Sequence, residues 1–341
     1  STPHGMNMFY KLWTDAEEKR NSYVPIEVHW SEVPGRDNKW KKETIANTSE
    51  QQFQTEFECE FLGSINTLIT ASKLKTLSYK TPVQSNAGLD VYEHPKKDNT
   101  YLLTADVSRG TSNDYSAYVV FDVTQVPYRI VAKFRDNEIK PLMFPQKIYH
   151  VAKAYNQAFV LVEVNDIGEQ VANALQYDME YDNLIMASMR GRAGQILGGG
   201  FSGGKAQLGV RTTKAVKKIG CSNLKQMVED NKLIIEDFDA INELSTFIVK
   251  GSSFEADDGC NDDMVACLFI FGWCTDQTYF KELTDNDIRQ QMYKENQDQI
   301  EQDMAPFGFV INGLEDENIG NAVDEYGTRW APIVRTYESD W

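Results

Sequence analysis

The sequence predicts an α/β protein whose mixed central sheet is flanked by helices. Three apolar strand-like runs follow one another, and strand-like and helical segments then alternate along the chain. The predicted strands are 101–107, 115–124, 128–134, 159–164, 184–187 and 233–235. The predicted helices of this region are 145–156, 168–177, 212–231, 240–249 and 262–274. Successive strands next to one another, followed by crossovers through helices, imply antiparallel and parallel pairs in one sheet.

Changes in residue composition and apolar periodicity divide the chain into four parts. Residues 1–65 are mixed, with helical patterns at 8–20 and 49–61 and a strand-like run at 24–30. Residues 66–99 are broken by Pro and Gly and predict a linker or an irregular arm. Residues 100–280 hold the α/β pattern, and residues 281–341 predict a loosely ordered acidic tail.

The charge of the chain is unevenly distributed. The formal net charge is −17, which taken alone argues against a nucleic-acid partner. The last 61 residues, however, carry 14 acidic and only 5 basic side chains. No acidic residue occurs between Asp182 and Glu229, and this stretch holds the basic residues Arg190, Arg192, Lys205, Arg211, Lys214, Lys217, Lys218 and Lys225. The net charge therefore conceals a basic stretch.

Acidic residues stand at three comparable places in the predicted fold. Asp106 lies near the end of one buried strand and Glu163 near the end of another, while Asp262 and Asp263 begin the last apolar helix. Functional sites of open α/β sheets lie at the carboxyl ends of strands. Carboxylates that converge there suit Mg²⁺, and two such ions clamp the attacking and leaving oxygens of a phosphodiester.

Each of these features also has a structural interpretation. An Asp at a helix start commonly caps the helix, and an Asp after a strand often only solvates a loop. The stretch Gly199–Ala206 nearly matches a phosphate-binding GxxxxGK[ST] loop, but Ala206 lacks the hydroxyl that binds Mg²⁺, so we reject it. Lysines on one helix face are frequently just solvated, whereas the absence of any balancing acid favours contact with a phosphate backbone.

Three motifs in this order resemble the nuclease domain of the large terminase, the DNA-packaging motor of tailed bacteriophages, with the T-even type most similar. They are TADVSRGTSNDYSA, VEVNDIGEQ and DGCNDDMVACLFIFGW. STPHGMNMFYKLW at residues 1–13 and EFECEFL at residues 56–62 resemble the end of that family's ATPase domain. The resemblance implies an RNase H-like fold, shared with retroviral integrases, for residues 100–280 and a remnant of the packaging ATPase for residues 1–65.

The resemblance also implies roles for individual residues. Asp106 would bridge two Mg²⁺ or Mn²⁺ ions, Glu163 would bind one, and the pair Asp262/Asp263 would supply the third carboxylate. The motif leaves open which member of the pair points inward, with a slight preference for Asp262. Asp114 and Asp166 are candidates for the outer shell. The basic residues that would contact DNA are Arg190, Arg192, Lys205, Arg211, Lys214, Lys217 and Lys218.

The implied activity is cutting of concatemeric double-stranded DNA with little sequence preference, as a magnesium-dependent hydrolase. The implied partners are DNA, a portal ring, a small terminase subunit and further copies in an oligomeric motor, in the host cytoplasm at the procapsid. The phosphate-binding loop of the family's ATPase is absent, so ATP would be used only by an upstream domain. The alternative is a module that grips DNA or docks a portal without cutting. No apolar run of about 18 residues predicts a membrane span.

Overall fold

The computed structural model describes residues 8–59, 66–111, 114–189, 195–197, 206–251 and 253–284. Residues 285–341, most of the predicted acidic tail, lie outside this range, as do Arg190, Arg192 and Lys205. Most of the glycine-rich stretch, residues 199–205, also lies outside it. None of the helices in the described ranges is long and apolar enough to cross a membrane.

A mixed sheet forms the centre of the described α/β fold, which confirms the predicted fold class. The sheet of the described residues has seven strands, in the order β1-β2-β5-β4-β3-β6 with β10 beside β5. β3 pairs antiparallel with β4 and parallel with β6, while β10 joins β5 in parallel. The strands are β1 (Gln84–Asn86), β2 (Leu89–Val91), β3 (Tyr101–Asp106), β4 (Ser116–Asp122), β5 (Tyr128–Asp136), β6 (Phe159–Val162) and β10 (Leu233–Ile234).

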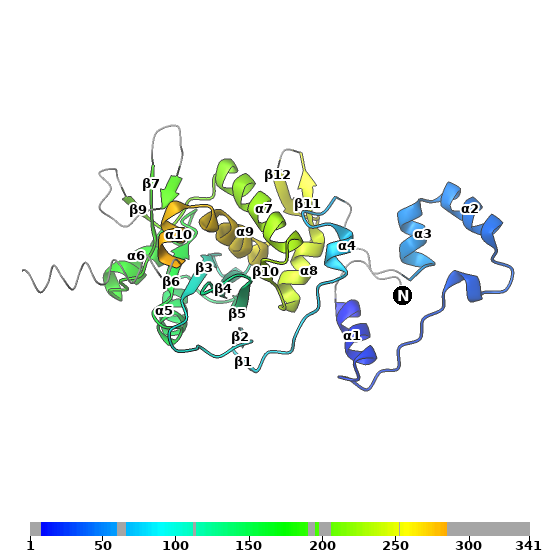
Figure 1. The fold of residues 1–341 in the computed structure, drawn as a ribbon, viewed down its shortest axis with the longest axis horizontal. Helices are drawn as coiled ribbons and strands as arrows, with labels where there is room; N and C mark the ends of the chain where they lie inside the picture. Colours follow the sequence, from blue (N-terminus) through cyan, green and yellow to red (C-terminus); the bar gives the residue numbers. More distant parts are fainter. Residues whose placement is uncertain are drawn as a thin grey trace, which may run out of the picture. The chain divides into compact units, whose positions relative to one another are not determined.

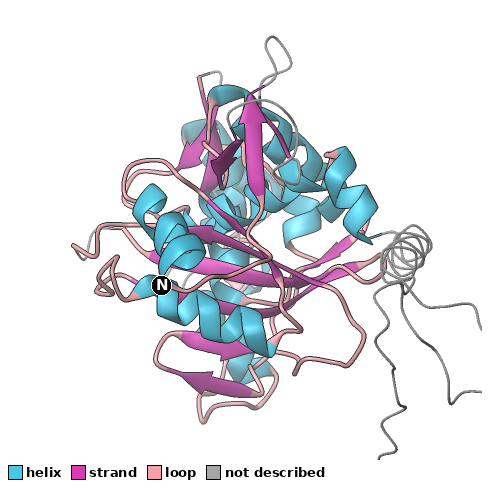
Figure 2. Ribbon diagram, turned by 90° about the vertical axis from the view of Figure 1, so that its left-hand side faces the viewer, coloured by secondary structure: helices cyan, strands magenta, loops and turns pink. Residues whose placement is uncertain are grey.

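Helices cover both faces of this sheet (Figures 1 and 2). One face packs against α7 (Lys214–Glu229), α8 (Phe238–Thr246) and α9 (Asp263–Thr275), and the other against α5 (Phe144–Ala154) and α6 (Gly168–Asn173). A π-helical turn, η2 (Ala174–Asp178), continues α6, and α10 (Thr278–Thr284) follows α9. The remaining strands form a small sheet of β7 (Met186–Met189), β8 (Gln195–Leu197) and β9 (Ala206–Leu208), and a hairpin of β11 (Phe247–Lys250) and β12 (Ser253–Ala256).

Alternation along the central strands produces two separate cores. Leu102 faces the core beneath α7 and α9, while its neighbours Tyr101 and Leu103 face the core beneath α5. Successive side chains of a strand point to opposite faces, so both faces of a doubly covered sheet must be apolar. This is why β3, β4 and β6 are nearly continuous apolar runs in the sequence.

Helix α9 lies in the interior, and its residues Asp263–Cys274 are all buried. It crosses α7 at two glycines: a Cβ on Gly220 would lie 2.2 Å from the carbonyl oxygen of Phe269, and one on Gly272 would lie 2.6 Å from the carbonyl oxygen of Gly220. The two backbones therefore approach more closely than any side chain allows. The sequence predicted α9 from its apolar composition, and its burial explains why it shows no polar face.

The N-terminal segment begins with α1 (Met8–Glu17), which contacts residues of the α/β region. The hydroxyl of Tyr79 donates a hydrogen bond to Asp15 at 2.9 Å. A cluster of aromatic rings, Trp30, Trp40, Phe53 and Phe57, holds together the 3₁₀ turn η1 (Trp30–Glu32), α2 (Asn38–Asn47) and α3 (Glu50–Glu56). The aromatic side chains of residues 30–57 thus form a small core of their own.

Several local expectations from the sequence are wrong. Residues 24–29 form no strand in the structure, and α2 lies between the predicted strand-like run and the second helical pattern, where no helix was predicted. Within residues 66–99, a short helix α4 (Ala71–Leu74) and the β1-β2 hairpin are ordered, and β2 pairs with β5. The helix expected at 240–249 ends at Thr246, where β11 begins. Short edge strands carry too little apolar periodicity to be recognised in a sequence.

We predict that Gly220→Ala strongly destabilises the fold. The added methyl group meets the Phe269 backbone of α9, so the two helices must separate. Overpacking of this kind costs about 2–3 kcal/mol of unfolding free energy, measurable by urea denaturation. Ser222→Ala on the exposed face of the same helix is the control and is expected to change stability little. Equal stabilities of the two variants would show that the helices do not meet at Gly220.

Candidate functional site

The parallel pairing of β3 with β6 brings two acidic residues together at the carboxyl ends of both strands. Asp106 is the last residue of β3, and Glu163 directly follows β6. The backbone amide of Glu163 donates to the carbonyl oxygen of Ala105 at 2.8 Å, so the register continues to the ends of the strands. Strand alternation places Leu102, Thr104 and Asp106 on one face of the sheet. On this face the hydroxyl of Thr104 donates a hydrogen bond to the carbonyl oxygen of Cys267 in α9. Asp106 and Glu163 therefore lie on the face covered by α9.

The carboxyl groups of Asp106 and Glu163 touch each other. A hydrogen bond between their side chains brings the two carboxyl groups into contact. Burial raises the pKa of Asp106 well above its ordinary value, and the negative charges of Glu163, Asp263 and Asp262 raise it further. Like charges this close disfavour joint ionisation unless a cation balances them.

The turn after Glu163 is built around that side chain. Asn165 donates to Oε1 of Glu163 at 2.8 Å and to the carbonyl oxygen of Thr212 at 3.3 Å. A Cβ on Gly168 would lie 1.8 Å from the carbonyl oxygen of Glu163, so only glycine allows the chain to fold back here. The VEVNDIG motif thus encodes a turn that fixes the orientation of Glu163.

The second pair of acidic residues stands at the start of α9. Asp263 is 8% exposed, and its Oδ1 accepts a hydrogen bond of 3.2 Å from the backbone amide of Tyr115. Its Oδ2 is buried without a hydrogen-bond partner. Burial raises the pKa of Asp263 to about 6 despite the opposing effect of Arg135. A buried carboxylate oxygen without a donor is a natural ligand for a cation.

Asp262 has a different environment from that of Asp263. It occupies the N-cap position of α9 but makes no capping hydrogen bond with its side chain. Helix capping, the ordinary interpretation of an Asp at this place, therefore does not apply to its side chain. The carboxylate instead lies 3.7 Å from Nζ of Lys217, whose ammonium group also sits over the rings of Phe247 and Phe269.

The site fits a divalent cation in its donor chemistry. Asp106, Glu163 and Asp263 supply carboxylate oxygens, which are the donors that Mg²⁺ prefers. The orphaned Oδ2 of Asp263 and the crowding around Asp106 both favour added positive charge. Among the described residues, however, no three His, Cys, Asp and Glu side chains are arranged to hold one metal ion. Lys217 supplies positive charge beside Asp262.

The two predicted outer-shell residues lie at the surface. Both oxygens of Asp166 are engaged by Arg109, with Nε and Nη2 each at 2.7 Å. This contact with Arg109 lowers the pKa of Asp166. Asp114 is exposed, and its charge contributes to the raised pKa of Asp263. Asp166 thus belongs to a surface ion pair, and Asp114 acts on the site only through its charge.

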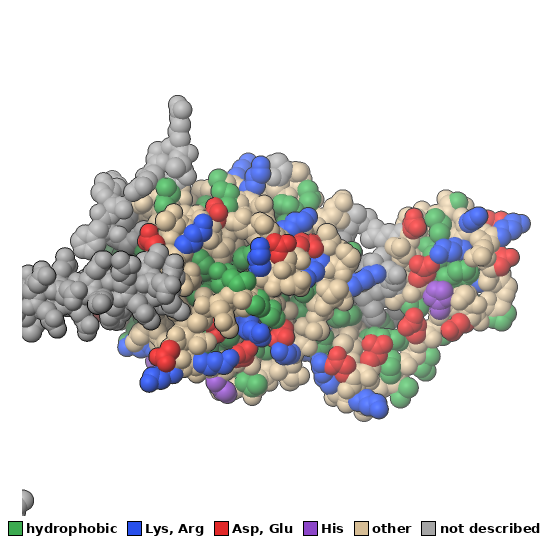
Figure 3. Space-filling model, viewed as in Figure 1, with side chains coloured by type: hydrophobic (Ala, Val, Ile, Leu, Met, Phe, Trp, Pro, Cys, Tyr) green, Lys and Arg blue, Asp and Glu red, His purple; other side chains and the backbone are tan. Residues whose placement is uncertain are grey.

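The basic residues of this stretch that the structure describes begin at Arg211. They lie just before α7 and on α7 itself. Arg211, Lys214 and Lys218 are exposed, whereas Lys217 is partly buried beside Asp262. Basic and acidic side chains alternate over the face drawn in Figure 3, so this face of the described region is not uniformly acidic. A local basic surface can thus exist in a chain of net charge −17.

Sequence reasoning missed the residues that support the acidic pair of α9. Glu243 lies in α8 and accepts hydrogen bonds from the backbone amides of Met264 and Val265. Arg135 of β5 lies between Glu243 and Tyr115. The sequence did contain a signal for them. Lys133 and Arg135 in one strand and Glu243 in a helix are charged residues within apolar segments, and an unpaired charge buried in such a segment is costly.

The fold and these acidic strand ends define an RNase H-like domain. Residues 103–271 match the family model described as the terminase RNaseH-like domain, and the match includes Asp106, Glu163, Asp262 and Asp263. The matched part of the chain, residues 103–271, is thus similar to an RNase H-like domain of the large-terminase type. The resemblance seen in the sequence is confirmed at this level.

Solved structures of three phage terminases are similar to this chain. One is the large terminase nuclease of thermophilic phage G20c with bound magnesium, at 18% identity and TM-score 0.47, covering 62% of this chain and 97% of that one. The nuclease domain of Thermus phage P74-26 matches at 20% identity and TM-score 0.45, covering 62% and 95%. The large terminase of a third thermophilic bacteriophage matches at 9% identity and TM-score 0.38, covering 79% and 60%.

We predict that Asp263→Asn stabilises the metal-free protein at neutral pH but not at pH 4. Because folding raises the pKa of Asp263 from 3.8 to about 6, the folded state binds this proton more tightly than the unfolded chain. Its stabilising contribution is therefore present below pH 4 and is lost as the pH rises through 6. Asparagine keeps the oxygen that accepts from Tyr115 but carries no charge.

The expected gain at pH 7 is about 2–3 kcal/mol, measured by urea unfolding in the presence of a chelator. Asp258→Asn, on an exposed loop, is the control and should show no gain. Parallel pH profiles for Asp263→Asn and the wild type would contradict the raised pKa.

Proposed function

We propose that this protein is the metal-dependent endonuclease of a viral DNA-packaging terminase and cuts double-stranded DNA with little sequence preference. The observation that carries the proposal is the contact of Asp106 with Glu163 at paired strand ends, beside the orphaned oxygen of Asp263. All three residues lie inside the matched terminase domain. The acidic cluster lacks the positive charge that divalent ions would supply.

Asp106, Glu163 and Asp263 would hold Mg²⁺ or Mn²⁺. When bound, the ions supply charge stabilisation for the attacking and leaving oxygens of the phosphodiester. The chain itself orients the ligands: Asn165 fixes Glu163, and the amide of Tyr115 fixes Asp263.

We propose Asp263 rather than Asp262 as the third inner ligand. Asp263 is buried with a free oxygen, whereas Asp262 is already neutralised by Lys217. The side chain of Asp262 is also 37% exposed, so solvent satisfies it without a metal ion. Asp262 then contributes charge to the site and, through Lys217, a connection to α7.

The exposed basic residues Arg211, Lys214 and Lys218 would contact the DNA backbone. Their side chains are solvent-exposed at and before the start of α7, while Lys217 on the same helix turns towards the acidic site. Contacts to phosphate are independent of base identity, which fits cutting without sequence preference. We extend this role to Arg190, Arg192 and Lys205 from their place in the same acid-free stretch of sequence.

In the virus, the domain would cut concatemeric DNA at the start and end of headful packaging. The partners would be the portal ring, the small terminase subunit and further copies in the motor, at the procapsid in the host cytoplasm. ATP hydrolysis would belong to the family's ATPase domain, to whose end residues 1–65 are proposed to correspond. The acidic motifs favour the T-even type within the terminases.

We predict that Asp106→Asn and Asp263→Asn abolish plasmid nicking in Mg²⁺, each lowering the rate by at least about 100-fold. Asp262→Asn is expected to retain more activity than either, because Asp262 is not an inner ligand. Asp230→Asn, remote and exposed at the end of α7, is the matched control. Nicking is followed on agarose gels with and without chelator.

Wild-type DNA binding without any metal-dependent cutting would support a gripping or portal-docking module instead. Full activity of Asp106→Asn would refute the site, and equal loss in Asp262→Asn and Asp263→Asn would refute the choice between them.

The double variant Lys214→Glu/Lys218→Glu is expected to weaken DNA binding by about tenfold at moderate salt, because two phosphate contacts become repulsive. The slope of log K against log salt should fall by about 2. Lys147→Glu, an exposed lysine of α5 on the opposite side of the sheet, provides the control for net charge. Equal losses in both variants would indicate a net-charge effect, not a surface on α7.

A further inference from the structure

Glu243 caps the helix that carries the acidic pair, although it lies in a different helix. Its Oε2 accepts hydrogen bonds from the backbone amides of Met264 at 2.7 Å and Val265 at 3.2 Å. The side chain is buried, and this burial raises its pKa to about 8. The first amides of a helix need an acceptor, and an adjacent residue usually supplies it. Here a remote carboxyl group supplies it.

Arg135 connects Glu243 with the other support of Asp263. Its Nη2 lies 2.8 Å from Oε1 of Glu243, so the two groups form an ion pair. Neither Oε1 of Glu243 nor Nε of Arg135 has a hydrogen-bond partner. Its guanidinium group stacks on the ring of Tyr115, 3.7 Å from the centroid. The amide of Tyr115 in turn donates to Asp263. Arg135 thus holds both elements that contact the start of α9.

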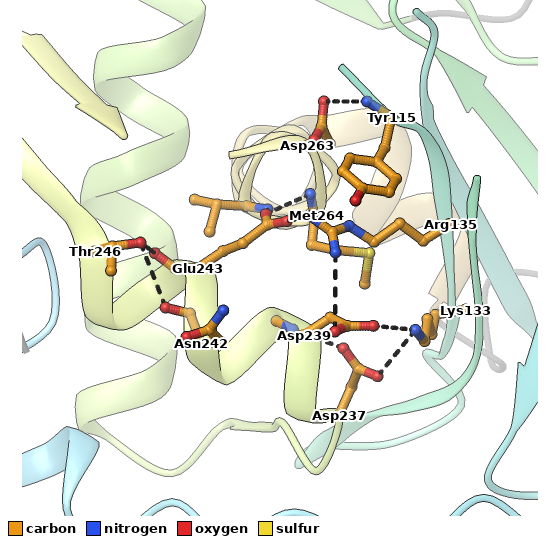
Figure 4. A network of polar contacts seen from close by, with 12 residues as sticks. Tyr115, Lys133, Arg135, Asp237, Asp239, Asn242, Glu243, Thr246, Asp263 and Met264 are labelled. Atoms are coloured by element: carbon orange, nitrogen blue, oxygen red, sulfur yellow. Dashed lines mark hydrogen bonds and ion pairs between the residues drawn. The ribbon is translucent and has the colours of Figure 1, made fainter. Parts of the chain in front are cut away.

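A second set of charges holds Arg135 and the start of α8 (Figure 4). Nη1 of Arg135 lies 3.9 Å from Asp239, which also pairs with the buried Lys133. Asp237 caps α8 through the amide of Ala240 at 2.7 Å and lies 3.8 Å from Lys133. The network therefore runs from β5 through the first turn of α8 to the first turn of α9.

Neither Asp262 nor Asp263 therefore has to cap α9 with its own side chain. A carboxylate that caps its own helix is turned onto the backbone and cannot bind a cation with the same oxygen. Because Glu243 satisfies the amides of Met264 and Val265, Asp263 keeps Oδ2 without any hydrogen bond. The remote cap thus leaves the helix-start carboxylates available.

We propose that Glu243, with Arg135 as its counter-charge, is a positioning residue that holds Asp263 ready to bind a divalent ion. The inference rests on the proposed function and names a further part of the same site. Replacing a buried ion pair by apolar groups is often neutral for stability, so stability alone does not explain a buried Glu–Arg pair at this place. The position of the pair explains it, because Arg135 lies between Glu243 and Tyr115, the two residues that support Asp263 and the start of α9.

The test measures the Mg²⁺ concentration required for half-saturation of the full chain, both by isothermal titration calorimetry and as half-maximal plasmid nicking. Glu243→Ala is expected to raise it by about tenfold or more, as for other residues that orient metal ligands. Glu243→Gln keeps an oxygen for the amides of α9 and should restore it to within about threefold. Asn223→Ala removes a side-chain contact at the far end of α9, to the carbonyl of Gly272, and should leave it unchanged.

Glu243→Ala leaves Arg135 buried without its partner, so the double variant Glu243→Leu/Arg135→Met, which removes both charges, is measured beside it. The same rise in half-maximal Mg²⁺ in that folded variant supports the proposal. An unchanged value in both, or an equal rise in Asn223→Ala, overturns it. Absence of metal-dependent nicking in the wild type overturns the proposed function itself, and the inference with it.

Discussion

The parallel pairing of β3 with β6 is the interaction on which the proposed site depends. It places Asp106 and Glu163 side by side on the face covered by α9, where their carboxyl groups are in contact. Two like charges at this distance are unfavourable in a partly buried place. A turn that only glycine permits at position 168 and the close crossing of α7 and α9 hold the surroundings in register. The fold thus concentrates negative charge that it does not neutralise fully.

Positive charge is supplied unevenly to the cluster. Lys217 lies beside Asp262, whereas Asp106 is in contact with the carboxyl group of Glu163, and Asp263 keeps one oxygen without a partner. The arrangement costs stability, as residues that serve a reaction often do. Lys217 is the residue whose role differs most from the expectation, since only its exposed neighbours Lys214 and Lys218 remain candidates for DNA contact on this turn of α7.

The sequence predicted the central fold well because buried strands and helices carry strong apolar patterns. It placed Asp106 and Glu163 correctly at strand ends, and it named the pair Asp262/Asp263 without separating its members. That choice depends on contacts with Tyr115 and Lys217, which are far away in the sequence. The capping by Glu243 was missed for the same reason, whereas the short strands β1 and β2 were missed because they carry too little apolar periodicity. Asp166 has a sequence context typical of a site but pairs with Arg109 at the surface.

The central claim is that Asp106, Glu163 and Asp263 together bind divalent ions. The most direct measurement is a crystal structure of the full chain soaked in Mn²⁺, with anomalous scattering recorded for the metal. The account predicts anomalous density in contact with Asp106 and Glu163 and with the free Oδ2 of Asp263, with Lys217 still beside Asp262. Metal density elsewhere, or none at this site, would contradict it.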